Sequence, residues 1–234
     1  MPIFGTVRAD HNYQMFASIV IGGRGVNGLK KGHPWVFAGD IVSRRFDIAG
    51  IVAVLDRKGG FLGQAFYSPI SNIALRFITR SKKSIGREYW AACVERALKR
   101  RREIDSDAYR VAYAESDGIP SVVIDRYNDI CAFQITSAGA ETVKEDIVGA
   151  INDVLAPTAI VEKDNVAIRE REGLETVERT VCGNSASTVI REGTQRFHVD
   201  VLSGQKTGAY LDYRRFRLKM PSIILSPSII LSPS

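Results

Sequence analysis

Short segments of alternating apolar and polar residues fill the first eighty positions of the chain. Five of them are rich in β-branched and aromatic side chains and are broken by glycines, at residues 16–21, 35–37, 50–55, 61–67 and 74–77. The sequence DRKGG at residues 56–60 lies between two of these segments, as a hairpin turn does. The pattern predicts strands, and we expect residues 16–83 to form a small β-barrel or sandwich.

From Ile85 the hydrophobic period lengthens to that of a helix. One stripe is apolar and comprises Ile85, Tyr89, Trp90, Cys93, Val94, Ala97 and Leu98. The opposite face is basic and comprises Arg87, Arg96, Lys99, Arg100, Arg101 and Arg102. Like charges at one helix end repel unless an anion offsets them, so this face either meets RNA or is simply solvated. We expect residues 84–104 to form a basic linker helix.

The pattern over residues 105–203 mixes strands with one helix. Strands are predicted at 109–114, 121–125, 130–136, 159–162, 176–181, 188–190 and 196–201. A helix is predicted at 138–155, stopped by Pro157. One helix cannot cover both faces of such a sheet, so one face is expected to meet another domain. The fold class is α+β, with a central α+β domain after the barrel and the basic helix.

The composition fits a soluble globular protein, with 45% hydrophobic and 25% charged residues. No apolar run approaches the roughly 20 residues of a membrane helix, and the N-terminus lacks the pattern of an export signal. The three cysteines, Cys93, Cys131 and Cys182, are scattered without metal-binding spacing. These features predict a cytoplasmic protein without a metal site or a membrane partner.

Charged residues are unevenly distributed along the chain. Residues 1–103 carry a net charge of +11, residues 104–200 of −9, and residues 201–234 of +4. A basic front joined to an acidic middle suggests two modules, of which the basic one faces a polyanion. Ordinary variation of surface charge is the alternative.

The sequence HPWVF at residues 33–37 brings aromatic side chains beside several cations. Cations next to a stacking surface are typical of RNA-binding sites, although the aromatic residues could equally fill the barrel. The candidate RNA-binding residues are Lys30, Lys31, His33, Trp35, Arg44, Arg45, Arg96, Lys99, Arg100, Arg101 and Arg102.

The glycine spacing at residues 23–28 matches a dinucleotide-binding fingerprint. That motif needs a helix that begins at the glycines, and Gly32 and Pro34 are expected to prevent one. Residues 117–120 and 125–129 are acidic, but Asp, Asn and Gly are also what turns require. We therefore predict no nucleotide site at the glycines and structural turns at the two acidic segments.

Residues 204–212, GQKTGAYLD, directly follow a predicted strand. The loop could hold an anion or position a base edge, and it lacks the glycine spacing of a P-loop. Its candidate active-site-adjacent residues, with the start of the next helix, are Gln205, Lys206, Thr207, Asp212 and Arg214. Further on, the sequence SIILSP occurs at 222–227 and again at 228–233. Residues 218–234 are expected to be an aberrant low-complexity tail.

Five ordered segments carry a family resemblance: 31–37 (KGHPWVF), 117–120 (DGIP), 123–127 (VIDRY), 170–174 (EREGL) and 204–208 (GQKTG), followed by Leu211 and Asp212. From about residue 17 to 217 the chain resembles the class I SAM-dependent methyltransferases of large-subunit ribosomal RNA. The resemblance implies an N-terminal PUA domain that binds RNA, a central α+β domain and a C-terminal Rossmann-like domain. It also implies methyl transfer from SAM to C5 of cytosine, with a cysteine nucleophile that attacks C6.

In that family the SAM motif and the catalytic cysteine lie beyond the position of Arg217. The resemblance thus implies that residues 204–217 only begin the methyltransferase domain, that the catalytic domain is absent and that this chain binds no SAM. No catalytic residue is assigned. The expected partner is ribosomal RNA, and a homodimer is left open. The alternative is a stand-alone RNA-binding module without catalytic activity.

Overall fold

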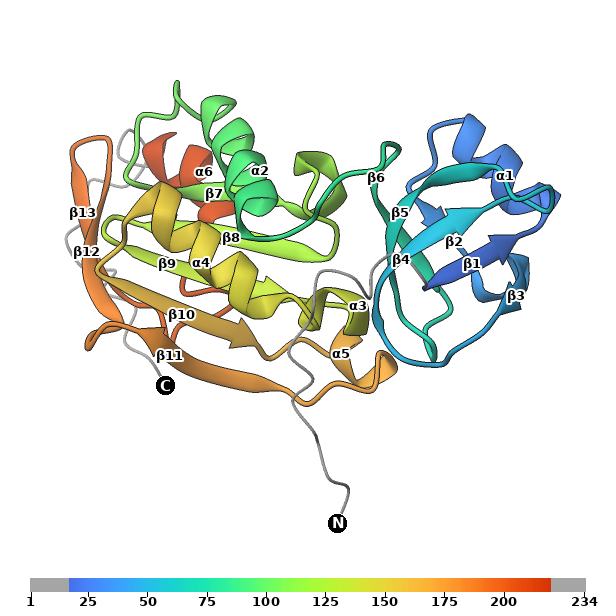
Figure 1. The fold of residues 1–234 in the computed structure, drawn as a ribbon. Coiled ribbons are helices and arrows are strands. Elements are labelled where there is room, and N and C mark those ends of the chain that lie inside the picture. Colours follow the sequence, from blue (N-terminus) through green and yellow to red (C-terminus); the bar gives the residue numbers. More distant parts are fainter. Residues whose placement is uncertain (1–16, 220–234) are drawn as a thin grey trace, which may run out of the picture.

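The computed structural model describes residues 17–219 (Figure 1). A curled sheet holds the N-terminal strands, a second sheet with helices packed on it lies beside the first, and a two-stranded hairpin follows (Figure 1). The repeated SIILSP segment lies outside the described residues. None of the helices within residues 17–219 is long and apolar enough to cross a membrane.

The N-terminal sheet has six strands in the order β2-β6-β5-β4-β1-β3, antiparallel except for β1 with β4. Its elements are β1 (Ser18–Ile21), α1 (Gly23–Lys30), β2 (Trp35–Val36), the 3₁₀ helix η2 (Ala38–Asp40), β3 (Ile41–Arg44), β4 (Gly50–Leu55), β5 (Phe61–Tyr67) and β6 (Leu75–Thr79). The predicted turn between β4 and β5 is confirmed, since the Asp56 carboxylate accepts hydrogen bonds from the backbone N–H groups of Lys58 and Gly60. β3 was absent from the predicted strands.

The prediction that no helix follows the glycine-rich segment 23–28 is wrong, because α1 begins there. Gly32 has a φ of +87°, so it lies just beyond the helix end and does not prevent the eight residues of α1 from forming. The strand after α1 is β2, which pairs with β6 and not with β1. These elements therefore do not form the parallel βαβ unit that a dinucleotide site requires.

The second sheet has five strands in the order β11-β10-β9-β8-β7, with only β9 and β10 parallel. Its elements are α2 (Arg87–Lys99), β7 (Ala108–Tyr113), η3 (Ala114–Asp117), β8 (Val122–Tyr127), β9 (Ile130–Ile135), α3 (Ala138–Glu141), α4 (Lys144–Leu155), β10 (Ala159–Asp164), α5 (Ile168–Arg171) and β11 (Val177–Cys182). A separate hairpin and two short helices follow: β12 (Ser187–Glu192), β13 (Gln195–Asp200), η4 (Leu211–Tyr213) and α6 (Arg214–Lys219). The predicted helix 138–155 is thus two helices, α3 and α4.

Helix α2 packs into the core of the second sheet and does not stand apart as a linker. Trp90, Cys93 and Val94 belong to one apolar cluster with the strands and with α4, which lies beside α2 on the same face (Figure 1). The predicted apolar stripe is confirmed. Phe66 of β5 joins the same cluster and stacks on Trp90 at a centroid distance of 5.6 Å. The two sheets therefore share buried apolar surface.

The opposite face of the second sheet is covered in part by the chain itself, which corrects the expectation that it meets only another domain. Tyr127, Ala132 and Val161 form a cluster there with Val199 of β13 and Leu211 of η4. The β12–β13 hairpin and the segment that begins at Leu202 therefore cover part of this face of the sheet.

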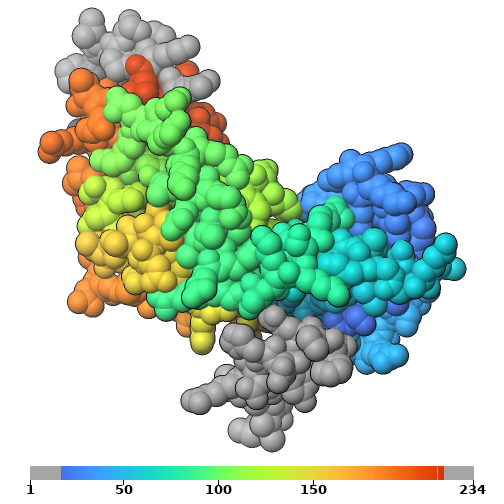
Figure 2. All heavy atoms as spheres, turned by 45° about the horizontal axis from the view of Figure 1, so that its top comes forward, coloured from blue at the N-terminus to red at the C-terminus, as the bar shows by residue number. Residues whose placement is uncertain are grey.

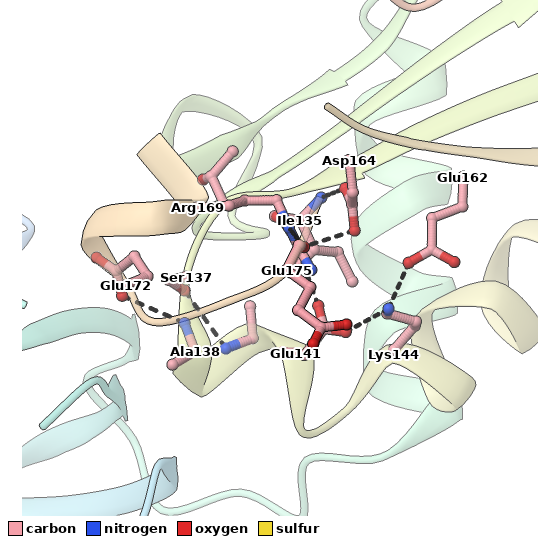
Figure 3. A network of polar contacts seen from close by, with 12 residues as sticks. Ile135, Ser137, Ala138, Glu141, Lys144, Glu162, Asp164, Arg169, Glu172 and Glu175 are labelled. Carbon is pink, nitrogen blue, oxygen red and sulfur yellow. Dashed lines mark hydrogen bonds and ion pairs between the residues drawn. The ribbon is translucent and has the colours of Figure 1, made fainter. Parts of the chain in front are cut away.

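A buried ion pair fastens the two sheets together. Glu172, which follows α5, accepts hydrogen bonds from Arg76 of β6 (2.8 Å) and from the hydroxyl of Ser71 (2.5 Å). Its second oxygen accepts from the backbone N–H of Ala138 at 3.2 Å (Figure 3). Glu172 and Arg76 are nearly inaccessible to solvent, so replacing either one would leave the other as an unpaired buried charge.

Arg169 organises a second buried network next to Glu172 (Figure 3). Its guanidinium donates to the carbonyls of Ile135 (2.6 Å) and Glu175 (2.8 Å) and lies 2.9 Å from a carboxylate oxygen of Asp164. It also donates to Glu141 at 3.1 Å. Burial raises the pKa of Asp164 to about 7 although this cation lies beside it. Arg169 and Glu172, the latter within the segment EREGL, therefore both have structural roles at the junction of the sheets.

Candidate functional site

A surface hollow of about 430 Å³ lies between the end of α2, strand β7 and the segment 206–214. Its volume falls within the range of small-molecule sites, about 300–1,000 Å³. Four cations and one carboxylate line it, namely Arg101, Arg110, Lys206, Arg214 and Asp212. The remaining lining residues are Ile104, Ala108, Tyr109, Tyr113, Ala209 and Leu211. The structure thus brings three of the predicted loop residues beside one predicted RNA-binding residue.

Arg101 is partly buried and is held by a buried carboxylate. Both of its terminal nitrogens donate to the carboxylate of Asp117, each at 2.6 Å, and one of them also donates to the carbonyl of Ala97. Asp117 is buried, and Arg100 lies 3.3 Å from it. The carboxylate of Asp117 therefore offsets part of the positive charge at the end of α2. Arg101 thus has a structural partner, and its predicted contact with RNA stays a prediction. Gly118, with a φ of +76°, follows Asp117 as the turn predicted at residues 117–120 requires.

Arg110 lines the hollow and is paired with Asp125 behind it, a pair that the sequence did not indicate. Two guanidinium nitrogens of Arg110 donate to the two oxygens of Asp125, at 2.8 and 3.0 Å. Asp125 is fully buried, whereas the side chain of Arg110 is 40% exposed and lies over the ring of Tyr113. These hydrogen bonds raise the pKa of Arg110. The sequence feature that could have indicated Arg110 is its position as an arginine that alternates with apolar residues in a predicted strand.

Thr207 anchors the GQKTG loop to the sheet. Its hydroxyl donates to Asp125 at 2.6 Å and lies 2.8 Å from the hydroxyl of Tyr127. The Tyr127 hydroxyl also accepts from the backbone N–H of Ala209. Behind the loop, the ammonium of the buried Lys163 donates to the carbonyl of Leu202 at 2.6 Å. The loop is therefore tied to β8 and β10 at several points.

The exposed side of this loop carries a compact charged group. Lys206 has a φ of +56°, and its ammonium lies 2.8 Å from Asp212 and 4.4 Å from the ring centre of Tyr210. The hydrogen bond from Lys206 lowers the pKa of Asp212. Gln205 is exposed and accepts a hydrogen bond from the Tyr210 hydroxyl. Arg214 lines the hollow, and within residues 17–219 the structure shows no carboxylate paired with it.

The predicted RNA-binding residues of the N-terminal sheet lie in two places. Lys30 and Lys31 are exposed at the end of α1, with the exposed His33 just after them. Arg44 and Arg45 are exposed at the end of β3, and Arg44 forms an ion pair with Asp47 at 2.7 Å. The four cations therefore come from two elements, Lys30 and Lys31 from the end of α1 and Arg44 and Arg45 from the end of β3.

The remaining basic residues of α2 differ in their contacts. Arg96 is exposed and donates to the sulfur of Cys93. Lys99 and Arg102 are exposed, and among the described residues neither has a carboxylate partner. Arg100 donates to the carbonyl of Ser116 at 3.0 Å. Lys99 and Arg102 are therefore the cations of this face most available to an external anion.

The cysteines of the core are not set up as nucleophiles. Cys93 and Cys131 are buried, and burial raises the pKa of both thiols, that of Cys131 to about 12. Both were predicted to be core residues. Cys182 is exposed at the end of β11. In the part of the chain that the structure describes, no group of three or more His, Cys, Asp or Glu side chains could hold a metal ion.

Residues 19–80 match the family model described as a PUA-like domain. The N-terminal sheet is a PUA-like domain. The match covers the curled sheet, from the second residue of β1 to the end of β6.

The chain is also similar to curated proteins beyond the PUA-like domain. It is 35% identical over 198 residues to "Ribosomal RNA large subunit methyltransferase I" of Pseudoalteromonas translucida, which is 81% of this chain and 50% of that protein. It is 37% identical over 193 residues to the protein of the same name from Vibrio vulnificus, covering 79% of this chain and 49% of that protein. The chain spans about half the length of the curated relatives it matches.

Solved structures share the fold. A putative SAM-dependent methyltransferase from Streptococcus mutans matches with a TM-score of 0.71 and 22% identity, over 86% of this chain and 52% of that one. A putative methyltransferase complexed with SAH matches with a TM-score of 0.72 at the same identity and coverage. From the sequence we expected that the catalytic domain is absent and that SAM does not bind. That expectation depends on where this sequence stops, and the protein need not stop there. These matches do not support that expectation, and we withdraw it.

Proposed function

We propose that the protein is a SAM-dependent methyltransferase of large-subunit ribosomal RNA, and that residues 17–219 supply an RNA-binding surface. The observation that carries the proposal is the hollow beside α2, where Arg110, Lys206 and Arg214 line one surface. Lys99 and Arg102 are exposed on the adjoining helix end. Phosphate groups are bound chiefly by such cations, and the named relatives act on ribosomal RNA.

The hollow itself does not fit SAM. A nucleoside cofactor needs a carboxylate for its ribose hydroxyls, by analogy with dinucleotide sites. The one carboxylate in the lining, Asp212, already forms an ion pair with Lys206. We therefore assign the hollow to RNA and derive no methyl-transfer step from its residues. C5 of cytosine as the methylated atom is part of the proposal and follows the resemblance of the five ordered segments.

The direct test is methyl transfer by the full-length protein. Unmodified large- and small-subunit ribosomal RNA are each incubated with the protein and SAM labelled on its methyl group. We expect label in the large-subunit RNA alone, recovered as 5-methylcytidine after digestion to nucleosides. Label in another nucleoside would correct the target atom. RNA binding without any label would favour the stand-alone RNA-binding module, and neither binding nor label would reject both functions.

A further inference from the structure

Aromatic side chains are exposed on the PUA-like domain where it adjoins the second sheet. Val36 of β2 is fully buried, whereas Phe37 next to it is 45% exposed. The ring centre of the exposed His33 lies 5.7 Å from that of Trp35 and 6.1 Å from that of Phe37. Phe37 therefore does not fill the barrel, which was one of the two readings of this segment.

This aromatic group continues onto the second sheet. The indole N–H of Trp35 donates to the carboxylate of Glu115 at 2.8 Å, across the junction of the two sheets. Glu115 lies two residues beyond Tyr113, the last residue of β7, whose side chain is 52% exposed. The guanidinium of Arg110 lies 5.1 Å from the centre of the Tyr113 ring. In Figure 2 the surface is indented where the two domains meet.

Tyr113 and Arg110 both line the hollow beside α2. Ring contacts join Phe37 and Trp35 to His33, and a hydrogen bond joins Trp35 to Glu115. Tyr113 lies two residues before Glu115 in the sequence and contacts Arg110. These six residues therefore lead from the PUA-like domain to the hollow. Exposed aromatic rings bind bases by stacking, and the cations beside them bind phosphates. Only unpaired bases offer their faces to such rings, since those of a duplex are stacked on one another.

We propose that a single-stranded segment of RNA lies along these residues, from Phe37 to the hollow. One base stacks on the His33–Phe37 pair and another on Tyr113, and the hollow takes a nucleotide whose phosphate faces Arg110 and Arg214. The inference rests on the proposed RNA-binding function and adds the class of RNA. Glu115 holds Trp35 in place across the junction, so it positions the ring and contacts no RNA.

The test compares a single-stranded oligonucleotide with a duplex of the same sequence, using the full chain and fluorescence anisotropy. Stacking on an aromatic ring contributes about 1–3 kcal/mol per base, so Tyr113→Ala is expected to weaken single-strand binding by roughly 5- to 100-fold. Tyr113→Phe keeps the ring and should bind like the unaltered protein. A 2-aminopurine base in the oligonucleotide reports stacking directly, and its quenching should be lost with Tyr113→Ala and kept with Tyr113→Phe.

The side chain of Tyr113 is half exposed, so both variants are expected to fold, and the thermal midpoint checks this. Equal affinity for single strand and duplex, together with unchanged binding by Tyr113→Ala and Phe37→Ala, would overturn the inference while RNA binding itself stood. Absence of binding to either RNA would reject the proposed RNA-binding function as well. Preference for the single strand with loss only in the alanine variants would support the inference.

Discussion

Replacing Arg169 by methionine is expected to lower the free energy of unfolding by about 3–5 kcal/mol, because it leaves the buried carboxyl group of Asp164 without its cation. Asp164 is fully buried, and Glu141 and two backbone carbonyls also lose a donor. For a chain of this size the loss corresponds to roughly 10 °C in the thermal midpoint. Urea denaturation followed by circular dichroism measures it. Arg171→Met, on the exposed side of α5, is the matched control and should change stability little.

The effect of this substitution should depend on pH. The pKa of Asp164 in the folded state, about 7, lies above its value in an unfolded chain, about 4. The folded carboxyl therefore keeps a proton that the unfolded one releases, and the contribution of Asp164 to stability falls as pH rises between these values. Without Arg169 the pKa rises further, so the destabilisation should be larger at pH 8 than at pH 5. An equal loss at both pH values would contradict this account of Asp164.

A fourfold charge neutralisation is expected to have the largest effect on RNA binding. Lys30, Lys31, Lys99 and Arg102 are exposed, and within the described part of the chain none forms an ion pair. If each contacts a phosphate, replacing all four by glutamine lowers affinity by roughly 10- to 100-fold near 0.1 M salt. The loss of four contacts also flattens the slope of log affinity against log salt concentration by about 3 to 4. Filter binding at several salt concentrations measures both quantities.

The matched control for this variant is a neutralisation elsewhere on the surface. Arg171 and Arg196 are exposed cations away from α1 and the end of α2. Replacing both by glutamine should leave the salt dependence nearly unchanged. The control removes two charges and the test variant four. A loss of binding free energy half as large in the control would therefore mean that RNA binding follows net charge alone and does not use this surface.

Much of the fold was predictable because its apolar periods are regular. The stripe that includes Trp90, Cys93, Val94 and Ala97 places α2 correctly, since a helix with one buried face must repeat at this spacing. Residues 50–55 and 61–67 form strands with the predicted bounds, joined by a turn that local chemistry specifies. These elements depend on contacts within a short stretch of sequence or on one continuous core.

The helix α1 was missed because packing overrides its local preference. Glycines disfavour helices, and the segment has three between residues 23 and 28. Gly25 is buried, and a Cβ atom there would lie 3.3 Å from side-chain atoms of Ile21, Val36 and Asp40. Gly25 therefore lets the helix approach the sheet closely. Local sequence preferences alone treat such a glycine as unfavourable to a helix.

The candidate site was only half predictable for a similar reason. Lys206 and Asp212 are close in sequence, and the loop that holds them stands out by its composition. Thr207, by contrast, depends on Asp125, which lies 82 positions earlier, and Arg101 depends on Asp117. A charge pattern shows which helix face is basic, but it does not show which of its cations a buried carboxylate already holds.

The most direct test of the RNA-binding surface is ultraviolet cross-linking of the full chain to single-stranded ribosomal RNA, with mass spectrometry of the attached peptides. The rings of Phe37 and Tyr113 are exposed on this surface, and Lys99 and Arg102 lie on the adjoining helix end. We expect the cross-links to fall within residues 30–37 and 99–113. Cross-links concentrated instead on β11, at Val177–Cys182 on the far edge of the second sheet, would contradict the account.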